Sequence, residues 1–422
     1  MRLKGSVLSG AILFAACATV MLAGMLFTAT ARASKADDTL VVALTKGLTT
    51  VDRLYSTQRE GLVLSRLTDD GLFTVDPKTL KFVPLAAQSY KWTDDTTLDV
   101  TLRKNIKFHD GSPMTADDVV YTYNWMLNKD AHTNRGPVVQ RWLKSVEKLG
   151  EYKVRFHLKF PYPMALRDMA ISVMLRKKGT YDKGHKSKLI LNAIGPYKVV
   201  EFTPGKKIVI ERFKDYYAGS PKGQPPIKRM VFEVIPDIGT QQAELLSGGI
   251  DFMYAVPTDV ADNLGHAPSV THLVGPDMRI SFIMMDAGGY TGKDSPFTKL
   301  KVRRAMNYAI NKQAIVKQLV RGTSEAIHTA CNPVQFGCVQ DVMNYQYDPA
   351  KAKQLLKEAG YPNGFAFDLW AYRDKEVAEA LVGDLNKAGI HATLRYVPLS
   401  VLARARRSRE TPAIFASYGG GG

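Results

Sequence analysis

Alternating apolar and polar residues predict short, half-buried strands in the first half of the chain. Residues 97–103 carry the sequence TLDVTLR, and residues 153–159 carry KVRFHLK. Every second residue of these runs is apolar, which is the period of a strand with one buried face. The mostly apolar runs at 39–44 and 231–236 predict two more strands. The turn-forming residues at 203–205 predict a hairpin.

Apolar residues at helical spacing predict amphipathic helices, most clearly in the last third of the chain. The apolar positions repeat every three or four residues in three segments: 302–310, 352–359 and 377–388. Asp348 and Pro349 are suited to begin the second helix, and Gly360 is suited to end it. Earlier in the chain, Thr115 and Asp118 have the spacing of a capping box, which predicts that a helix starts there.

The first 33 residues have the features of a secretory signal peptide. Arg2 and Lys4 precede a long apolar stretch, and the small-x-small run at 31–33 predicts cleavage after Ala33. The rest of the chain is therefore expected outside the cytoplasm. Two alternatives stay open: lipidation at Cys17, where LFAAC faintly resembles a lipobox, and an uncleaved anchor, because the stretch approaches the length of a membrane span.

The chain is strongly basic. Its formal net charge of +17 becomes +14 when residues 1–33 are removed. Such a charge attracts anionic solutes, an anionic membrane face or nucleic acid. A solvated surface of scattered lysines and arginines is the simpler interpretation, and we expect no nucleic-acid partner because no RNA-reading signature accompanies the charge. The basic run at 176–188 lacks periodicity and predicts an exposed loop.

Two cysteines remain after the expected cleavage. Cys331 and Cys338 are separated by six residues in a loop that contains Pro333 and Gly337. In an oxidising compartment, an isolated pair at this spacing is most simply a local disulfide. A redox or metal role is the alternative, but the sequence contains no C-x-x-C motif and no second pair of ligands nearby.

The dipeptide His109-Asp110 is the strongest candidate for catalysis. Such pairs bind metals in some hydrolases, and a carboxylate beside an imidazole can transfer protons. The other seven histidines are scattered singly, and the sequence contains neither a G-x-S-x-G elbow nor a phosphate-binding G-x-x-x-x-G-K-[ST] motif. We therefore expect no enzyme, and an exported metal-dependent hydrolase using His109 and Asp110 is the alternative.

A long segment that includes this dipeptide matches the pattern F-x-P-x-L-A-x-S-W, followed by L-R-x-x-x-K-F-H-D-G-x-P-x-T-A-x-D-V. The matching residues are Phe82, Pro84, Leu85, Ala86, Ser89, Leu102, Arg103, Lys107, Phe108, His109, Asp110, Gly111, Pro113, Thr115, Ala116, Asp118 and Val119. The pattern resembles that of the family 5 extracellular solute-binding proteins, the periplasmic components of peptide, nickel and related ABC importers. Tyr90 stands where the family often has tryptophan. Further blocks extend the resemblance over about residues 39–418.

The resemblance implies an α/β fold of the type II periplasmic-binding-protein kind. This fold has two lobes with mixed sheets around a ligand cleft, plus an extra small subdomain. The implied domains are the signal peptide at 1–33, a discontinuous lobe I at 34–60 and 190–265, its small subdomain at 61–189, and lobe III at 266–422.

The resemblance also implies which residues hold the solute. They are Leu48, Thr49, Thr50, Ser56, Thr57, Gln58, Tyr254, Arg279, Tyr372, Arg373 and Tyr418. The planar guanidinium of Arg373 is suited to pair with a solute carboxylate. For each residue, ordinary packing or a solvated charge is the alternative interpretation. The resemblance assigns His109 and Asp110 to a structural turn.

The implied function is capture of a short peptide or related amine-carboxylate compound, and its delivery to ABC transporter permease subunits in the inner membrane. We expect a monomer without a cofactor, while nickel, haem, an opine or an oligosaccharide remain alternative ligands. In peptide-binding members, the region that corresponds to Tyr418 resembles W-x-x-D, and a long segment then returns to the first lobe. Here glycines follow Tyr418, and no acid is present. A first lobe without the returning segment would expose strand edges and apolar surface, so we expect a fragment, and a naturally short protein is the alternative.

Overall fold

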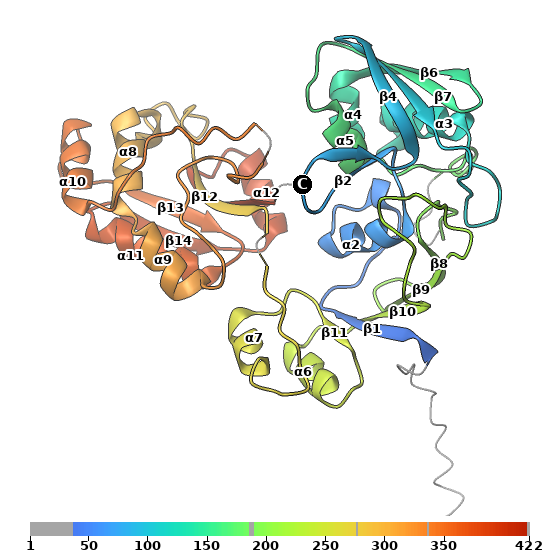
Figure 1. Ribbon diagram of the computed structural model, residues 1–422. Coiled ribbons are helices and arrows are strands. Elements are labelled where there is room, and N and C mark those ends of the chain that lie inside the picture. The colour runs from blue at the N-terminus through green and yellow to red at the C-terminus, as the bar shows by residue number, and fades with distance from the viewer. Residues whose placement is uncertain (1–36, 185–189, 276, 336, 420–422) are drawn as a thin grey trace, which may run out of the picture. The chain divides into compact units, whose positions relative to one another are not determined.

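The structure is a computed structural model that describes residues 37–184, 190–275, 277–335 and 337–419 (Figure 1). The expected signal peptide at 1–33, Cys17 and the glycines at 420–422 lie outside these residues. The described chain forms two compact units that divide between Ala255 and Val256. Within the described residues, no helix is both long enough and apolar enough to cross a bilayer.

The first unit contains most of the strands. These are β1 (Thr39–Leu44), β2 (Phe73–Val75), β3 (Phe82–Pro84), β4 (Ala87–Asp94), β5 (Thr97–Leu102), β6 (Leu143–Gly150), β7 (Lys153–Leu158), β8 (Tyr197–Thr203), β9 (Lys207–Arg212), β10 (Arg229–Val234) and β11 (Phe252–Met253). The helices are η2 (Arg53–Tyr55), α2 (Arg59–Thr68), α3 (Ala116–Leu127), η3 (Lys129–Ala131), α4 (Gly136–Trp142), α5 (Ala165–Ser172) and α6 (Ile238–Leu246).

A five-stranded mixed sheet joins the two ends of the first unit. Its strand order is β11-β1-β10-β9-β8. β1 lies parallel to both neighbours and pairs Thr39 with Arg229, whereas β8, β9 and β10 are antiparallel. β8 and β9 flank residues 203–205, so the predicted hairpin is confirmed. Val42 and Leu44 of β1 pack in one core with Leu48 and with residues of β8, β9 and β10.

A four-stranded antiparallel sheet, β4-β5-β7-β6, forms the centre of the segment that follows α2. The predicted alternation is confirmed, because the apolar residues of β5 and β7 are buried in one large core that also takes residues of α3, α4 and α5. Asp99 of β5 is also buried, and it accepts hydrogen bonds from Arg155. The predicted capping box is present at the start of α3, where the Asp118 carboxylate accepts the Thr115 N–H at 2.8 Å.

The prediction for the basic run at 176–188 is wrong at its first residue. The run is a loop, but the Arg176 side chain is fully buried. Its guanidinium contacts the carboxylates of Asp52 and Asp69, which lie more than 100 residues earlier in the chain. The neighbouring sequence carries no sign of such distant partners. From the sequence alone, a buried arginine in a basic run therefore looks the same as a solvated one. Residues 185–189 lie outside the described chain.

The second unit alternates helices with strands. Its strands are β12 (Arg279–Met285), β13 (Ala366–Ala371), β14 (His391–Tyr396) and β15 (Ala413–Gly419). Its helices are α7 (Thr258–Leu264), η4 (Pro296–Thr298), α8 (Leu300–Ala309), α9 (Lys312–Ile315), the π-helix η5 (Val316–Val320), α10 (Pro349–Glu358), α11 (Lys375–Lys387) and α12 (Leu399–Arg407).

A mixed sheet in the order β12-β15-β13-β14 forms the centre of the second unit. β13 is parallel to β14 and β15, and β12 is antiparallel to β15. The predicted stripes of the last third are confirmed in outline, since α8, α10 and α11 bury their apolar residues in one core beside the sheet. Asp348 caps α10 by accepting the Lys351 N–H, with Pro349 as the first helical residue.

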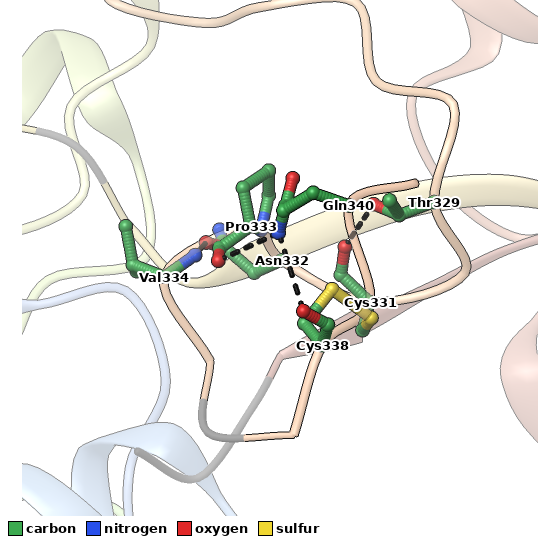
Figure 2. The surroundings of a disulfide bond; sticks show 7 residues. All are labelled: Thr329, Cys331, Asn332, Pro333, Val334, Cys338 and Gln340. Atoms are coloured by element: carbon green, nitrogen blue, oxygen red, sulfur yellow. Dashed lines mark hydrogen bonds between the residues drawn. A yellow bond between two sulfur atoms is a disulfide. The ribbon is translucent and has the colours of Figure 1, made fainter. Parts of the chain in front are cut away.

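The predicted disulfide between Cys331 and Cys338 is present in the loop that follows η5 (Figure 2). Hydrogen bonds keep the bridged segment compact. The Thr329 hydroxyl donates to the Cys331 carbonyl at 2.6 Å, and the Gln340 side-chain amide donates to the Pro333 carbonyl at 2.9 Å. The bridge therefore closes a short loop that these hydrogen bonds also hold together.

Candidate functional site

Six of the predicted ligand residues of the first unit lie on the loop that leaves β1, and the seventh, Tyr254, lies elsewhere. This loop is held against the β8–β9 hairpin, because the Leu48 carbonyl accepts the Gly205 N–H at 2.8 Å. A side chain at Gly47 would have its Cβ only 2.4 Å from the Gly205 Cα, so only glycine allows this approach. The Gln58 amide donates to the Gly47 carbonyl at 3.4 Å and ties the two ends of the loop together.

The structure divides the predicted loop residues into buried and accessible ones. Leu48, Thr50 and Ser56 are buried: Leu48 packs in the core of the five-stranded sheet, and the other two side chains form hydrogen bonds within the loop. Thr50 accepts the Asp52 N–H, for example, and Ser56 accepts the Gln58 N–H. The side chains within reach of a solute are those of Thr49, Thr57 and Gln58.

Tyr254 lies at the end of the first unit, just after β11. Its ring is 5.1 Å from the Arg59 guanidinium, measured to the ring centre, which is a cation–π geometry. Arg59 is the first residue of α2 and is exposed. It directly follows Gln58, in the segment 55–59 for which the family resemblance implies further ligand contacts. Together the two side chains offer an aromatic face and a positive charge.

A buried ionic cluster fixes the position of this loop. Asp52 caps the short helix η2, and its carboxylate also accepts hydrogen bonds from Arg176 at 3.0 Å and from the Tyr181 hydroxyl at 2.7 Å. Arg176 donates to Asp69 at 2.7 Å as well. Three segments distant in sequence therefore meet at one guanidinium, and the loop cannot shift without disturbing the others.

Burial and ion pairing shift the pKa values of Arg176 and Asp69 in opposite directions. Burial opposes the charged form of Arg176, but the carboxylates of Asp69 and Asp52 hold its pKa well above the ordinary value. Burial raises the pKa of Asp69, and the charge of Arg176 opposes that rise. Burial also raises the pKa of the Tyr181 hydroxyl, so this group stays a neutral donor to Asp52. The cluster thus consists of one cation shared by two acids.

The predicted ligand residues of the second unit gather at one edge of its sheet. Tyr372 and Arg373 follow the last residue of β13, and Tyr418 lies near the end of the parallel strand β15. Arg279 begins the antiparallel strand β12, opposite Gly419. In sheets of this kind, ligands bind beyond the carboxyl ends of the parallel strands, which is where these four residues lie.

Arg373 is held in place but keeps donors for a ligand. Its Nη1 donates to the Ser417 hydroxyl at 2.6 Å, and its Nε donates to the Asp374 carboxylate at 2.9 Å. Among the described residues Nη2 has no partner, and the side chain is 28% exposed. Sequence reasoning missed Ser417, because only the pairing of β13 with β15 brings residue 417 beside residue 373.

His109 and Asp110 have structural partners in a turn of the first unit. The His109 imidazole makes a 3.0 Å hydrogen bond with the Gly195 carbonyl, and burial lowers its pKa to about 4. Although partial burial acts the other way, hydrogen bonds from Lys177 and Ser112 lower the pKa of Asp110. Over the described part of the chain, no group of three or more His, Cys, Asp or Glu residues has the geometry for a metal ion.

Comparisons with known proteins agree with this arrangement. The profile of the family described as "Bacterial extracellular solute-binding proteins, family 5 Middle" matches residues 81–422. The oligopeptide-binding protein AppA of Bacillus subtilis strain 168 is 30% identical over 394 residues, which covers 86% of this chain and 70% of AppA. The dipeptide-binding protein of Escherichia coli K12 is 28% identical, over 75% of this chain and 63% of its own length.

A solved structure extends the likeness to the fold. The structure of Bacillus subtilis AppA in complex with a nonapeptide has a TM-score of 0.70 and 27% sequence identity. The match covers 90% of this chain and 79% of that one. The sheets and the sequence blocks that occupy them are therefore those of one family. The chain belongs to family 5 of the bacterial extracellular solute-binding proteins.

Proposed function

We propose that the protein captures a short peptide or a related amine-carboxylate compound outside the cytoplasm, as a monomer. It then delivers this solute to the permease of an ABC transporter. The observation that carries the proposal is the position of Arg373 at the carboxyl ends of β13 and β15, with a guanidinium group that is both anchored and partly exposed. A planar guanidinium binds a carboxylate through paired hydrogen bonds. AppA and the dipeptide-binding protein, named for peptides, support the same ligand class.

Each unit, taken by itself, carries groups suited to a peptide-like solute. The first unit offers the Tyr254 ring with Arg59, and the backbone of a loop fixed by buried ionic contacts. The second unit offers Arg373 and the half-exposed Tyr418. A solute that binds one conformation of the protein more tightly than another raises the population of that conformation. Capture is then a shift between conformations rather than a chemical reaction.

Titration calorimetry with defined peptides tests this proposal. A set of di- to nonapeptides identifies a binder, and the same peptide with an amidated C-terminus lacks the carboxylate. We expect Arg373→Gln and amidation each to weaken binding about tenfold or more, and the two changes together to cost little beyond either one. This is the pattern of a direct contact.

The matched control is Lys375→Gln, which removes a positive charge two residues away from an exposed pair with Glu379. We expect this variant to bind like the unaltered protein. Nickel–histidine, haem, an opine and an oligosaccharide serve as competitors in the same assay. Binding of one of these, with none of the peptide set bound, would overturn the peptide assignment and leave the family assignment intact.

A further inference from the structure

The end of α12 carries an arginine cluster that solute capture does not use. Within six residues the chain presents Arg404, Arg406, Arg407 and Arg409, all exposed. Among the described residues none of the four has an acidic partner. Arg279, Arg303 and Arg304 of the second unit also form no ion pair among the described residues, but they are not clustered with one another on one short segment. Three other arginines of the unit are paired. Arg321, Arg373 and Arg395 each form an ion pair, with Asp262, Asp374 and Asp368 respectively.

The topology places the arginine cluster away from the candidate ligand edge. α12 follows β14 and precedes β15, and both strands are parallel to β13. The helix therefore runs back from the carboxyl ends of the strands to the start of β15, where the cluster lies. Leu402 and Ala405 pack the helix on Trp370 and Ile414 of the sheet, which turns its basic residues outward. Arg373 and Tyr418 lie at the opposite end of these strands.

An exposed aromatic ring completes this surface. The Arg409 guanidinium lies 5.7 Å from the centre of the Tyr290 ring, and Tyr290 is 68% exposed. Tyr290 follows β12, whose last residue, Met285, pairs with Ala413 at the start of β15. Tyrosine is enriched where proteins meet the membrane interface, because its ring is apolar and its hydroxyl is polar. A single acid, Glu410, adjoins the cluster in sequence.

The favourable interaction of cations with the helix dipole does not explain why all four arginines are clustered at the end of α12. Arginines in the last turn stabilise a helix because its carboxyl end is partially negative, and this applies to Arg404, Arg406 and Arg407. Arg409 lies beyond the helix, and neighbouring like charges repel one another in the absence of counter-charges. Arginine also binds phosphate with paired hydrogen bonds, which lysine cannot do.

We propose that Arg404, Arg406, Arg407, Arg409 and Tyr290 form a docking surface for the anionic phospholipid face of a membrane. A protein partner would need a central group of buried apolar anchors, whereas this surface offers cations and one ring. An anionic bilayer needs only exposed cations near its phosphates. Docking would hold the protein at the membrane while the opposite edge of the sheet stays open to solute. It also gives a role to part of the net positive charge of the chain.

Vesicle co-sedimentation of the full chain tests this inference. The probes are vesicles of phosphatidylcholine with 30% phosphatidylglycerol, and vesicles of phosphatidylcholine alone. Each basic residue near an anionic surface is worth about a fivefold change in affinity. Replacing all four arginines with glutamine should therefore weaken binding to the anionic vesicles at least a hundredfold. Binding of the unaltered chain should also fall with added salt.

A charge-matched control separates the arginine cluster from net charge. Replacing Lys351, Lys353, Lys357 and Lys375 with glutamine removes the same charge from α10 and the start of α11. This variant should keep at least a third of the anionic-vesicle affinity. Any binding through the apolar stretch before residue 34 is common to all variants and persists on neutral vesicles. Equal loss in both variants, or no loss in the arginine variant, would overturn the proposal.

Two further measurements keep the outcome clear. Circular dichroism melting should show a cooperative transition for the arginine variant only slightly below that of the unaltered chain, because the four side chains are exposed and their replacement removes only the helix-dipole interaction of three of them. The affinity of the arginine variant for peptide should also be unchanged. A failure of the membrane-docking proposal can therefore be told apart from a failure of the solute-capture proposal. If the arginine variant sediments normally with vesicles but loses binding to purified permease subunits, the surface docks a protein and the membrane proposal is wrong.

Discussion

Replacing Arg176 with alanine should destabilise the first unit severely. Arg176 is completely buried and donates to Asp52 at 3.0 Å and to Asp69 at 2.7 Å, and both carboxylates are 1% exposed or less. Removing the shared cation leaves two acids buried with too few donors. Breaking a buried pair in this way costs about 3–5 kcal/mol. The neighbouring pair of Lys177 and Asp110 is 37% and 44% exposed, so Lys177→Ala should cost about 1 kcal/mol or less.

Urea unfolding followed by tryptophan fluorescence measures both values, because three of the four tryptophans lie in the first unit. The free energy of unfolding comes from the midpoint and slope of the first-unit transition. A variant with Arg176→Met, Asp52→Asn and Asp69→Asn removes all three charges and should recover more than half of the loss. If Arg176→Ala costs no more than Lys177→Ala, the buried cluster does not stabilise the unit as reasoned.

Three further predictions concern single contacts. Burial lowers the pKa of His109 from its ordinary 6.5 to about 4. Between these pH values the imidazole binds a proton in the unfolded chain but not in the folded chain. The contribution of His109 to the free energy of unfolding is therefore complete above pH 6.5, and it falls by up to roughly 3 kcal/mol as the pH drops to 4. His109→Gln should flatten that slope in urea unfolding at several pH values; an unchanged slope would contradict it. Replacing Cys331 and Cys338 with serine should lower the stability of the second unit by roughly 2.5 kcal/mol, the loop-closure value for a separation of seven residues, with the reduced protein as control. Asp118→Ala should cost about 1 kcal/mol by removing the cap of α3, and Asp118→Glu, which restores a capping acid, should cost less.

Local patterns in the sequence predicted the elements well. The alternation in β5 and β7, the apolar stripes of α8, α10 and α11, and the capping box of α3 are all properties of neighbouring residues. The paired cysteines were also close enough in sequence for their bond to be predicted.

Contacts between distant segments escaped prediction. The burial of Arg176 depends on acids more than 100 residues away, and the partnership of Arg373 with Ser417 depends on how β13 pairs with β15. For the candidate site, the resemblance indicated the loop at 47–59 and the end of the second sheet, while the geometry added Ser417 and the pairing of Arg59 with Tyr254. It also showed that Leu48, Thr50 and Ser56 are turned into the fold. Side-chain direction in an irregular loop is not encoded by any short-range period.

The position of β1 inside its sheet has a consequence for the order in which the protein is made. β1 is the first strand of the described chain, yet its two neighbours are β10 and β11, and Thr39 pairs with Arg229. A chain that emerges from its amino end first therefore carries an apolar strand without a partner until some 190 residues have followed. Closing so long a loop is slow, and an unpaired apolar strand is prone to aggregate meanwhile. The small antiparallel sheet β4-β5-β7-β6 can form during this wait, because its strands lie close together in sequence. Residues 39–44 are therefore an expected binding site for chaperones that hold nascent chains.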